Sequence, residues 1–372
     1  MADPRESCRP GSHAVVEVRM ITIGVDAHKW LNAAVAVDEA GRVLGQWTGD
    51  NDTPGWAALL AWATALGPDH RWGIEGAWGY GRGLAQFLVA AAETVYDVNP
   101  RWTVEGRRRA RSRGKSDGLD ARAIAAAVVR ESVGLPRVGA EDETAILDLL
   151  VSERDGALAE ATRLRNQLHA VLQHLDPRYR DGLRDLRRPA GARALLDYRA
   201  PADTALARER AATVRRLAKR LELALGQAAE LETQITARAA ACFSPLTKLP
   251  GVRLLTAGAL ASILGPGRRF ATEAQLAAYA GAAPLETSSA GHVRHRLNRG
   301  GNRRLNAILH RIAVTQLRCS PEAQRYVARR RSEGKSQREA IRALKRFLVR
   351  AVWRRWQECQ SSQAASSATA AA

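Results

Sequence analysis

The stretch ITIGVDAHKWLNAAVAVDEAGRVLGQW, residues 21–47, contains three short β-type runs, at 21–25, 31–37 and 42–47. Turn residues such as Asp38 and Gly41 separate the second run from the third. Apolar and β-branched runs bounded by turn residues are typical of strands. Three such strands in quick succession predict an antiparallel meander at the start of the folded chain.

The segments that follow alternate between helix and strand. A helix with apolar spacing begins near Trp56, a strand ends at Glu75, a helix covers about 84–92, and a further strand covers 94–98. Strands first and then alternation predict an α/β domain with a mixed sheet over residues 20–135. This order matches a ribonuclease-H-like layout, although periodicity alone does not separate that layout from other mixed α/β folds.

The bulk composition points to a polyanionic partner. The chain has 372 residues, which favours two or more domains, and a formal net charge of +19. Most of the positive charge is arginine, which suits bidentate phosphate contacts but is equally expected from a GC-rich genome. The net sign of the charge therefore carries more weight than the choice of residue.

Cysteine usage and hydropathy predict a cytoplasmic protein. The four cysteines are far apart with no CxxC spacing, which argues against a zinc ribbon and a disulfide framework. No apolar stretch reaches the roughly 20 residues that span a bilayer. Residues 1–19 lack a secretory signal pattern and are expected to be a disordered leader, with translation starting at Met20. We expect a prokaryotic, nucleoid-associated location.

The remainder of the chain is predicted to be mainly helical. Residues 136–243 carry two long amphipathic helices, which favour either a helical spacer or a dimerising coiled coil. Residues 244–330 form a further domain, in which Leu249-Pro250-Gly251-Val252 resembles a helix-hairpin-helix turn that presents backbone N–H groups to phosphate. A basic helix at 331–358, part of a helical segment from Tyr326 to Trp356, and a disordered Ser/Ala-rich tail at 359–372 complete the chain.

Four acidic residues occupy positions from which they can converge. Asp26 and Glu75 each end a strand-like run, and Asp117 and Asp120 lie three residues apart at the start of a helix that is expected from Asp120 onward. Carboxylates suit hard divalent cations, and two such ions about 4 Å apart support phosphodiester chemistry. Each acid alone is more simply a helix cap or a solvated strand end. Together they predict a metal site.

Two serines precede a strongly basic segment. Ser288 and Ser289 lie in a glycine-bearing loop, where serines are ordinarily turn residues. Here, however, no acidic residue occurs from His292 to Arg318. A hydroxyl in such surroundings would lie beside a phosphate of bound nucleic acid, where a serine can act as a nucleophile. The histidines of this segment match no standard metal spacing and are expected to be solvated or to face phosphate.

Nucleic-acid contacts are predicted for basic residues near both constellations. His28 is expected to be structural. The predicted contacts are Lys29, Arg107, Arg108, Arg109, Arg111, Arg113, Lys115, Arg294, Arg296, Arg299, Arg303 and Arg304.

Four motifs together resemble the DEDD insertion-sequence transposases (the IS-one-ten family), over residues 21–317. They are Val25-Asp26-Ala27-His28-Lys29, Ile74-Glu75-Gly76, Lys115-Ser116-Asp117-Gly118-Leu119-Asp120-Ala121-Arg122, and Gly281…Pro284…Ser288-Ser289…Arg299-Gly300-Gly301-Asn302-Arg303. The resemblance implies a RuvC-like N-terminal domain whose acids Asp26, Glu75, Asp117 and Asp120 act on Mg²⁺, with two ions expected. It also implies a coiled-coil segment and a C-terminal transposase domain with a catalytic serine.

The resemblance carries further expectations about the serine and the partners. The family serine directly precedes glycine, whereas Ala290 intervenes here, so Ser289 is favoured as nucleophile and Ser288 is next. Family members act as oligomers, so a dimer or tetramer is expected, acting on element ends and target DNA. Some members use a structured noncoding RNA from their own element to bridge donor and target DNA, and only the resemblance bears on whether this chain uses such a guide RNA.

Three functions remain to be compared. The first is a transposase, a DNA recombinase that moves its own insertion element by Mg²⁺-dependent strand cleavage and exchange with a serine nucleophile. The second is a RuvC-like structure-specific endonuclease that hydrolyses branched DNA with metal alone, which needs no basic serine loop. The third is a nucleic-acid-binding protein with a dead site, against which the presence of all four acids argues.

Overall fold

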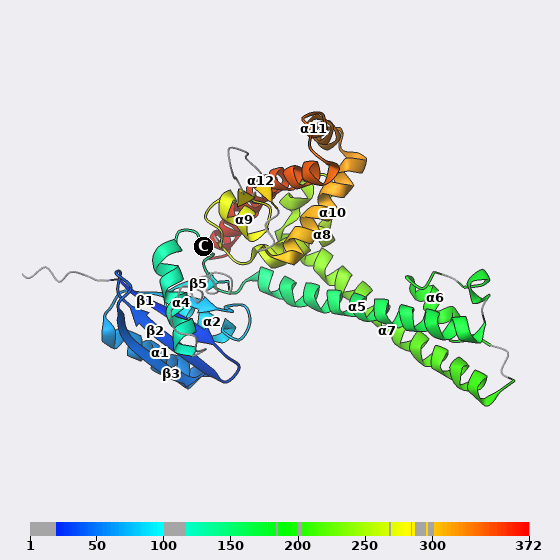
Figure 1. Cartoon of the computed structure of the whole chain (residues 1–372), viewed down its shortest axis with the longest axis horizontal. Coiled ribbons are helices and arrows are strands. Elements are labelled where there is room, and N and C mark those ends of the chain that lie inside the picture. The colour runs from blue at the N-terminus through cyan, green and yellow to red at the C-terminus, as the bar shows by residue number, and fades with distance from the viewer. Residues whose placement is uncertain are drawn as a thin grey trace, which may run out of the picture. The chain divides into compact units, whose positions relative to one another are not determined.

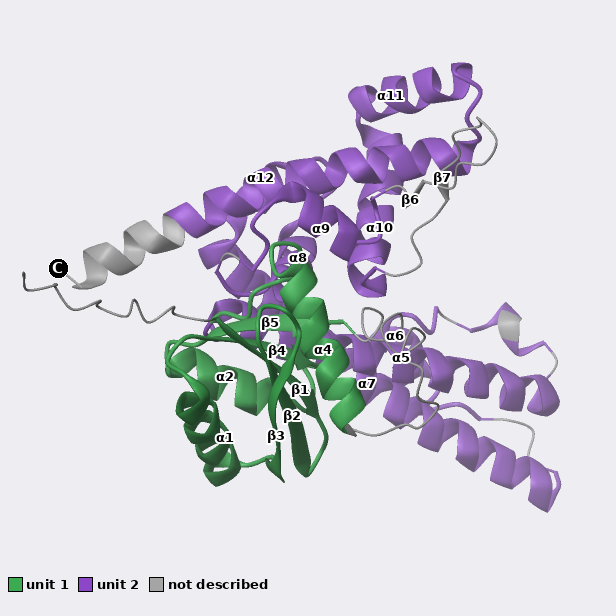
Figure 2. Ribbon diagram, turned by 60° about the vertical axis from the view of Figure 1, so that its left-hand side comes forward, with its two compact units in different colours: residues 1–139 green, residues 140–372 purple. Residues whose placement is uncertain are grey.

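The chain forms two compact units in the computed structural model, residues 1–139 and 140–372 (Figure 2). The structure describes residues 20–99, 117–176, 178–183, 185–199, 203–267, 269–283, 285–286, 295–296 and 301–371. The side chains of Asp117, Arg180, residues 285–286 and 295–296, and residues 362–371 lie outside this description.

The first unit is built on a five-stranded mixed sheet (Figure 1). Its elements are β1 (Ile21–Ala27), β2 (Leu31–Val37), β3 (Val43–Asp50), α1 (Thr53–Leu66), β4 (His70–Glu75), α2 (Arg82–Ala90), β5 (Thr94–Val98) and α4 (Asp117–Glu131). The strand order is β3-β2-β1-β4-β5. Strand β2 pairs antiparallel with both β1 and β3, whereas β4 pairs parallel with both β1 and β5. The predicted meander and mixed sheet are confirmed, and the order is consistent with a ribonuclease-H-like layout.

Helices cover both faces of this sheet (Figure 2). Because side chains alternate along a strand, the odd-numbered positions of β1 and the even-numbered positions of β4 share one face. Ile23, Val25 and Trp72 on that face form a core with Leu59 of α1 and Leu84 of α2. The opposite face is covered by α4, which packs on β1, β2 and β4. Burial of apolar surface on both faces stabilises the sheet between its helices.

The second unit is mainly helical. Its elements are α5 (Glu143–Leu175), η1 (Tyr179–Asp181), α6 (Pro189–Ala194), α7 (Ala205–Cys242), η2 (Ser244–Lys248), α8 (Leu254–Leu264), α9 (Glu273–Tyr279), β6 (Leu285–Glu286), β7 (His295–Arg296), α10 (Arg303–Cys319), α11 (Pro321–Ser332) and α12 (Gln337–Ala371).

The helices α5 and α7 pack as an antiparallel hairpin within one chain (Figure 1). Ion pairs join Arg238 to Glu143, Arg154 to Glu232 and Arg220 to Glu160, so residue numbers fall along one helix as they rise along the other. Between the helices runs a seam of buried residues that includes Leu164, Leu168, Val214 and Leu221. The two helices of the hairpin therefore bury their apolar stripes against each other over much of their length.

The core of this unit forms around α8, which contributes seven buried residues from Ala257 to Leu264. Helices α7, α9, α10 and α12 pack against the same cluster, and Phe243 stacks on Trp356 at a ring-centroid distance of 5.4 Å. The turn at Pro250-Gly251 packs on α10, since Gln316 Nε2 donates to the Pro250 carbonyl at 2.8 Å and Gly251, at a φ of 80°, lies against Thr315. Packing is the structural role of this turn.

Two differences from the sequence-based expectation lie near the C-terminus. The segment from Tyr326 to Trp356 is not one helix, because Gly334 adopts a φ of 84° and separates α11 from α12. Helix α12 also continues to Ala371, through the Ser/Ala-rich segment expected to be disordered. Alanine is the strongest helix former, which favours this extension. Among the described residues, no helix is both long and apolar enough to cross a membrane.

Candidate active site

Two of the four predicted acids are paired by the register of the sheet. Asp26 of β1 lies directly opposite Glu75 of β4 in the parallel ladder. Neighbouring strands lie about 4.8 Å apart, and residues opposite one another in a ladder project to the same face. The ladder therefore brings these two carboxylates to one face of the sheet, at the carboxyl ends of two adjacent strands. Asp26 is nearly buried, with 13% of its side chain exposed.

The third acid is placed by the close approach of α4 to the same face. A Cβ atom on Gly24 would lie 2.1 Å from the Ala121 carbonyl oxygen, and one on Gly73 would lie 2.4 Å from Val128. Gly24 and Asp26 are two residues apart, as are Gly73 and Glu75, so the acids share the face that α4 covers. Asp120 directly precedes Ala121 and is 5% exposed. Two glycines thus let the helix carry a buried carboxylate onto the face of Asp26 and Glu75.

The fourth acid, Asp117, is the first residue of α4, and its side chain lies outside the described residues. The helix begins three residues earlier than expected, so Asp117 and Asp120 both belong to it, in agreement with the predicted i, i+3 spacing. Among the described residues, no group of three or more His, Cys, Asp or Glu side chains stands close enough to hold a metal ion. His28 Nε2 lies 3.4 Å from Asp26 Oδ2, so this histidine contacts one of the two carboxylates.

The turn after β1 is fixed by a residue that sequence reasoning missed. Asn51 follows β3, and its Nδ2 donates to the carbonyl oxygens of His28 at 2.8 Å and Tyr80 at 3.0 Å. Its backbone N–H donates to the Trp30 carbonyl at 2.8 Å. A lone asparagine before the helix-capping Asp52 resembles an ordinary turn residue, so the sequence gives no signal of this role.

The two ends of the segment that carries Ser288 and Ser289 lie next to each other in the second unit. Both serines lie outside the described residues, but β6 and β7 on either side of them pair antiparallel, with Leu285 opposite Arg296. A Cβ on Gly301 would lie 2.1 Å from the Gly281 backbone nitrogen, so the two glycines are in backbone contact. We refer to residues 281–301 as the serine hairpin.

A hydrogen-bond network fixes the base of the serine hairpin. The Asn302 N–H donates to the Tyr279 carbonyl at 2.6 Å, and Asn302 Nδ2 donates to the Tyr279 hydroxyl at 2.9 Å. Asn302 Oδ1 accepts from the Leu305 N–H and so caps α10. Arg269, which is 6% exposed, donates to the same hydroxyl at 3.3 Å. Asn302 thus joins α9 to α10 at the hairpin's base.

A buried lysine supports this base from α12. Lys345 Nζ donates to Asn306 Oδ1 at 2.8 Å, and Asn306 Nδ2 donates to the Ala280 carbonyl at 2.8 Å. Burial, followed by repulsion from Arg342, lowers the pKa of Lys345 from its ordinary value. Because a lysine in a predicted basic helix is ordinarily solvated, sequence reasoning assigned it no role.

The predicted nucleic-acid contacts fall mostly outside the described residues. This holds for Arg107, Arg108, Arg109, Arg111, Arg113, Lys115, Arg294 and Arg299, and for the side chain of Arg296. Lys29 and Arg303 are exposed. Arg304 is also exposed, and its Nη1 donates to Asp148 Oδ1 at 3.3 Å and to Ser152 Oγ at 3.4 Å on α5.

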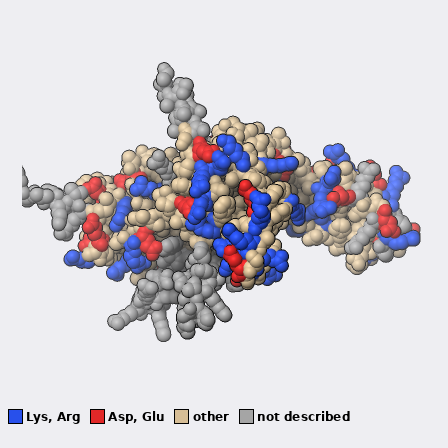
Figure 3. Space-filling model, turned by 90° about the horizontal axis from the view of Figure 1, so that it is seen from above, with Lys and Arg blue, Asp and Glu red and all other residues tan. Residues whose placement is uncertain are grey.

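A further basic surface lies on α11 and the start of α12. Its exposed members are Arg325, Arg329, Arg331, Lys335 and Arg338. Acidic residues interrupt it: Arg330 bonds to Glu333 at 2.7 Å and lowers the pKa of that carboxyl. Figure 3 shows the same mixture, with acidic side chains among a band of basic ones on the face drawn.

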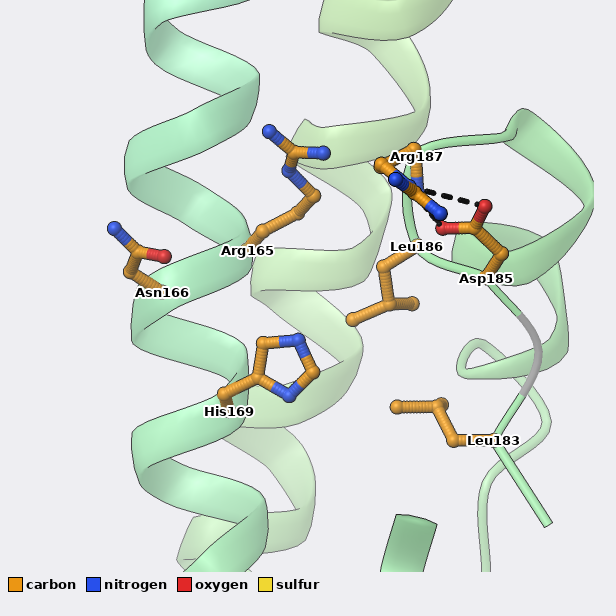
Figure 4. Close-up of a pocket in the computed structure, with 7 residues that line it drawn as sticks. All are labelled: Arg165, Asn166, His169, Leu183, Asp185, Leu186 and Arg187. Atoms are coloured by element: carbon orange, nitrogen blue, oxygen red, sulfur yellow. Dashed lines mark hydrogen bonds and ion pairs between the residues drawn. The ribbon is translucent and has the colours of Figure 1, made fainter. Parts of the chain in front are cut away.

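A cavity of about 590 Å³ lies beside the helical hairpin (Figure 4). Arg165, Asn166 and His169 of α5 form one wall, and the segment before α6 forms the other. Arg187 there bonds to Asp185 at 2.9 Å and lowers the pKa of that carboxyl. The cavity includes none of the predicted site residues.

Comparison with known proteins identifies the family. A model of DEDD transposases of IS110, described as Transposase, matches residues 23–177, and one described as Transposase IS116/IS110/IS902 family matches residues 244–328. The Insertion element IS110 uncharacterized 43.6 kDa protein of Streptomyces coelicolor is 30% identical over 278 residues, 63% of this chain and 69% of the relative. The Insertion element IS900 uncharacterized 42 kDa protein of Mycobacterium paratuberculosis is 29% identical over 379 residues, 89% of this chain and 94% of the relative.

Each of the two family models matches one of the two groups of candidate site residues described above. The first covers β1 from Ile23 onward, β4 and α4 with the four acids, and the second covers the serine hairpin and α10. An enzyme with the DEDD domain uses divalent metal, and a transposase binds DNA. The chain belongs to the IS110 family of transposases, enzymes that move insertion elements.

Proposed function

We propose that this transposase divides its chemistry between two groups: a carboxylate site in the first unit and a serine nucleophile in the second. The carboxylates are Asp26, Glu75, Asp117 and Asp120, and the nucleophile is Ser289, with Ser288 as the alternative. The observation that carries the proposal is the register pair Asp26–Glu75 on the face onto which α4 brings the buried Asp120.

The four acids would together hold a pair of Mg²⁺ ions, with Asp117 needed because no three acidic, histidine or cysteine side chains within the described residues stand close enough to hold one. Asp26, Glu75 and Asp120 supply oxygen ligands, the kind Mg²⁺ prefers. Carboxylates gathered on one face, with Asp120 buried and Asp26 13% exposed, favour a divalent cation that offsets their negative charge. When bound, Mg²⁺ would stabilise negative charge on the phosphate that is cut. His28, in contact with Asp26, would orient that carboxylate.

The serine would make the covalent bond. In this step the serine Oγ bonds to phosphorus as the bond from phosphorus to one bridging deoxyribose oxygen breaks. The serine loses its proton, and the departing deoxyribose oxygen takes one up, so charge and atoms balance. The phosphoserine ester keeps the energy of the broken bond, and a deoxyribose hydroxyl of another strand reverses the step. This route joins new partners without an external energy source.

The serine hairpin is built to hold such a group. Its ends are fixed by the Gly281–Gly301 contact and by Asn302, so its position follows that of α9 and α10. Basic residues that follow the serines, including Arg294 and Arg299, would bind the DNA backbone. We extend to this chain two family expectations, assembly as a dimer or tetramer and use of a guide RNA from its own element.

Metal-dependent cleavage of element-end DNA, with and without the serines, tests this function. Wild-type protein is expected to cut DNA in Mg²⁺, to stop in EDTA, and to leave DNA covalently bound to protein. The Ser288→Ala/Ser289→Ala double variant is expected to bind DNA without cutting it. If the double variant cut DNA and left free ends, the chain would act as a metal-only nuclease.

A further inference from the structure

Two large aromatic side chains of the first unit are exposed to solvent. Trp30 is 73% exposed and Tyr80 is 64% exposed. Large apolar groups that gather at the surface indicate an interaction site, whereas isolated ones need no explanation. The relevant question is therefore whether these two residues lie together, and beside what.

Both residues follow the strands that carry the carboxylate pair. Trp30 lies between β1 and β2, shortly after Asp26, and Tyr80 lies between β4 and α2, shortly after Glu75. Because β1 and β4 are parallel and Asp26 is opposite Glu75, the two connections leave the same edge of the sheet. The aromatic residues therefore belong to the edge at which the candidate active site lies.

Asn51 joins the two connections directly. Its Nδ2 donates to both the His28 and the Tyr80 carbonyls, at 2.8 and 3.0 Å, and its backbone N–H donates to the Trp30 carbonyl. Its Oδ1 accepts from Trp56 Nε1 at 2.8 Å and Asn32 Nδ2 at 3.0 Å. With its side chain held by these bonds, Asn51 fixes the backbone of both aromatic residues. The aromatic rings are exposed on a rigid support, which favours stacking because little backbone freedom remains to be lost.

A cation accompanies the aromatic rings. Lys29 Nζ lies 4.8 Å from the ring centroid of Trp30. Aromatic faces together with a basic side chain are the combination that binds single-stranded nucleic acid, since bases stack on the rings and phosphates pair with the cation. Bases within a duplex are already stacked on their neighbours and offer no free face. The combination thus selects unpaired nucleotides.

We propose that Trp30 and Tyr80 form a stacking platform for unpaired DNA bases beside the carboxylate site. The proposal rests on the proposed function for the identity of the strand, since a transposase must separate the strands that it exchanges. The platform would hold a nucleotide next to the phosphate that is cut. Lys29 would bind a phosphate of the same strand.

Fluorescence of 2-aminopurine tests the platform in the full-length protein. A single-stranded DNA that contains this base analogue is titrated with protein in EDTA, so that no cleavage takes place. Stacking on an aromatic ring quenches the analogue, and the wild-type protein is expected to quench it on binding. Trp30→Ala and Tyr80→Ala are each expected to weaken single-strand binding about fivefold or more, with loss of quenching.

Matched variants separate stacking from other effects. Trp30→Phe keeps an aromatic face and is expected to retain quenching, whereas Trp30→Leu keeps apolar area alone and is expected to lose it. Leu44→Ala removes another exposed apolar side chain of the same unit, 45% exposed on β3, and is expected to bind as wild type. Duplex DNA of the same sequence is expected to bind the Trp30→Ala protein within about twofold of wild type.

Three results would overturn the platform. Wild-type affinity and quenching in both alanine variants would exclude stacking on these rings. Equal losses for duplex and single strand would indicate backbone contacts instead, and tighter binding of the matching RNA strand would assign the surface to RNA. Failure of the proposed function is recognised separately, because quenching is measured without cleavage. A protein that quenches but never cuts keeps the platform and loses the proposed mechanism.

Discussion

The carboxylate face of the first unit and the serine hairpin of the second are positioned in different ways. Asp26, Glu75 and Asp120 lie on a strand ladder and a helix, and close backbone packing at Gly24 and Gly73 fixes the distance between those two layers. The serine hairpin is held at its ends, through Gly281, Gly301 and Asn302. The first arrangement suits a metal site, which requires fixed geometry. The second fixes the points at which the serine segment joins α9 and α10.

The largest expected effect comes from the carboxylate face. Glu75→Gln keeps the size of the side chain but removes its charge, so cation binding weakens and cleavage is expected to fall by about three orders of magnitude. Rates of strand cleavage in Mg²⁺ measure this effect. Glu131→Gln, at the exposed last residue of the same α4, is the matched control and is expected to cut DNA as wild type does. Equal rates for wild type and Glu75→Gln would show that the carboxylate face takes no part in strand cleavage.

Adding a methyl group at Gly24 tests whether close packing positions the metal site. Gly24→Ala places a Cβ 2.1 Å from the Ala121 carbonyl oxygen, so α4 must move away and Asp120 with it. We expect a destabilisation of about 1–3 kcal/mol, as for other overpacked sites. We also expect weaker Mg²⁺ binding, so that cleavage needs a higher Mg²⁺ concentration. Thermal unfolding and Mg²⁺ titration of the rate measure the two consequences.

Gly156 provides the control for that substitution. It lies in α5, and a Cβ there would meet nothing within 4 Å. Gly156→Ala is expected to stabilise the second unit by about 0.5–1 kcal/mol, because alanine favours the helix. A Gly24→Ala protein as stable and as active as Gly156→Ala would show that the contact between Gly24 and α4 does not position the metal site.

The base of the serine hairpin is tested at Asn302. Asn302→Ala removes both the cap of α10 and the bond to the Tyr279 hydroxyl, and a lost cap costs about 1 kcal/mol. Asn302→Asp keeps a capping oxygen and loses the donor to Tyr279. Faster hydrogen exchange at the start of α10 is expected in the alanine variant, whereas a fall in cleavage is expected in both.

Lys248→Ala, on η2 in the same unit, provides a reference for Asn302. Its ammonium group lies 3.6 Å from Glu358 on α12, outside the hairpin base. This exposed ion pair contributes little stability, so wild-type cleavage is expected. If Asn302→Asp also cleaved as wild type does, the bond to Tyr279 would not matter for positioning the serines.

Much of the fold and part of the site follow from the sequence alone. The antiparallel meander, the mixed sheet and the placement of Asp26 and Glu75 at strand ends were predicted, because short β-type runs and their order along the chain indicate them. The contact of Gly24 with α4 was not, since a glycine in a strand gives no signal of its distant neighbour. Asn51 was missed for the same reason. Gly334 lies inside a helical pattern, where a glycine is a sequence signal for the break between α11 and α12.

The most direct test of the divided chemistry is to identify the protein residue that becomes linked to DNA. A nicked substrate that loses its leaving strand traps the covalent state, and mass spectrometry of the digested complex locates the DNA-bearing peptide. We expect an Mg²⁺-dependent adduct on the peptide that contains Ser288 and Ser289, and we expect it to be absent from the double alanine variant. Cleavage that proceeds in full with no adduct, or an adduct on another residue, would contradict it.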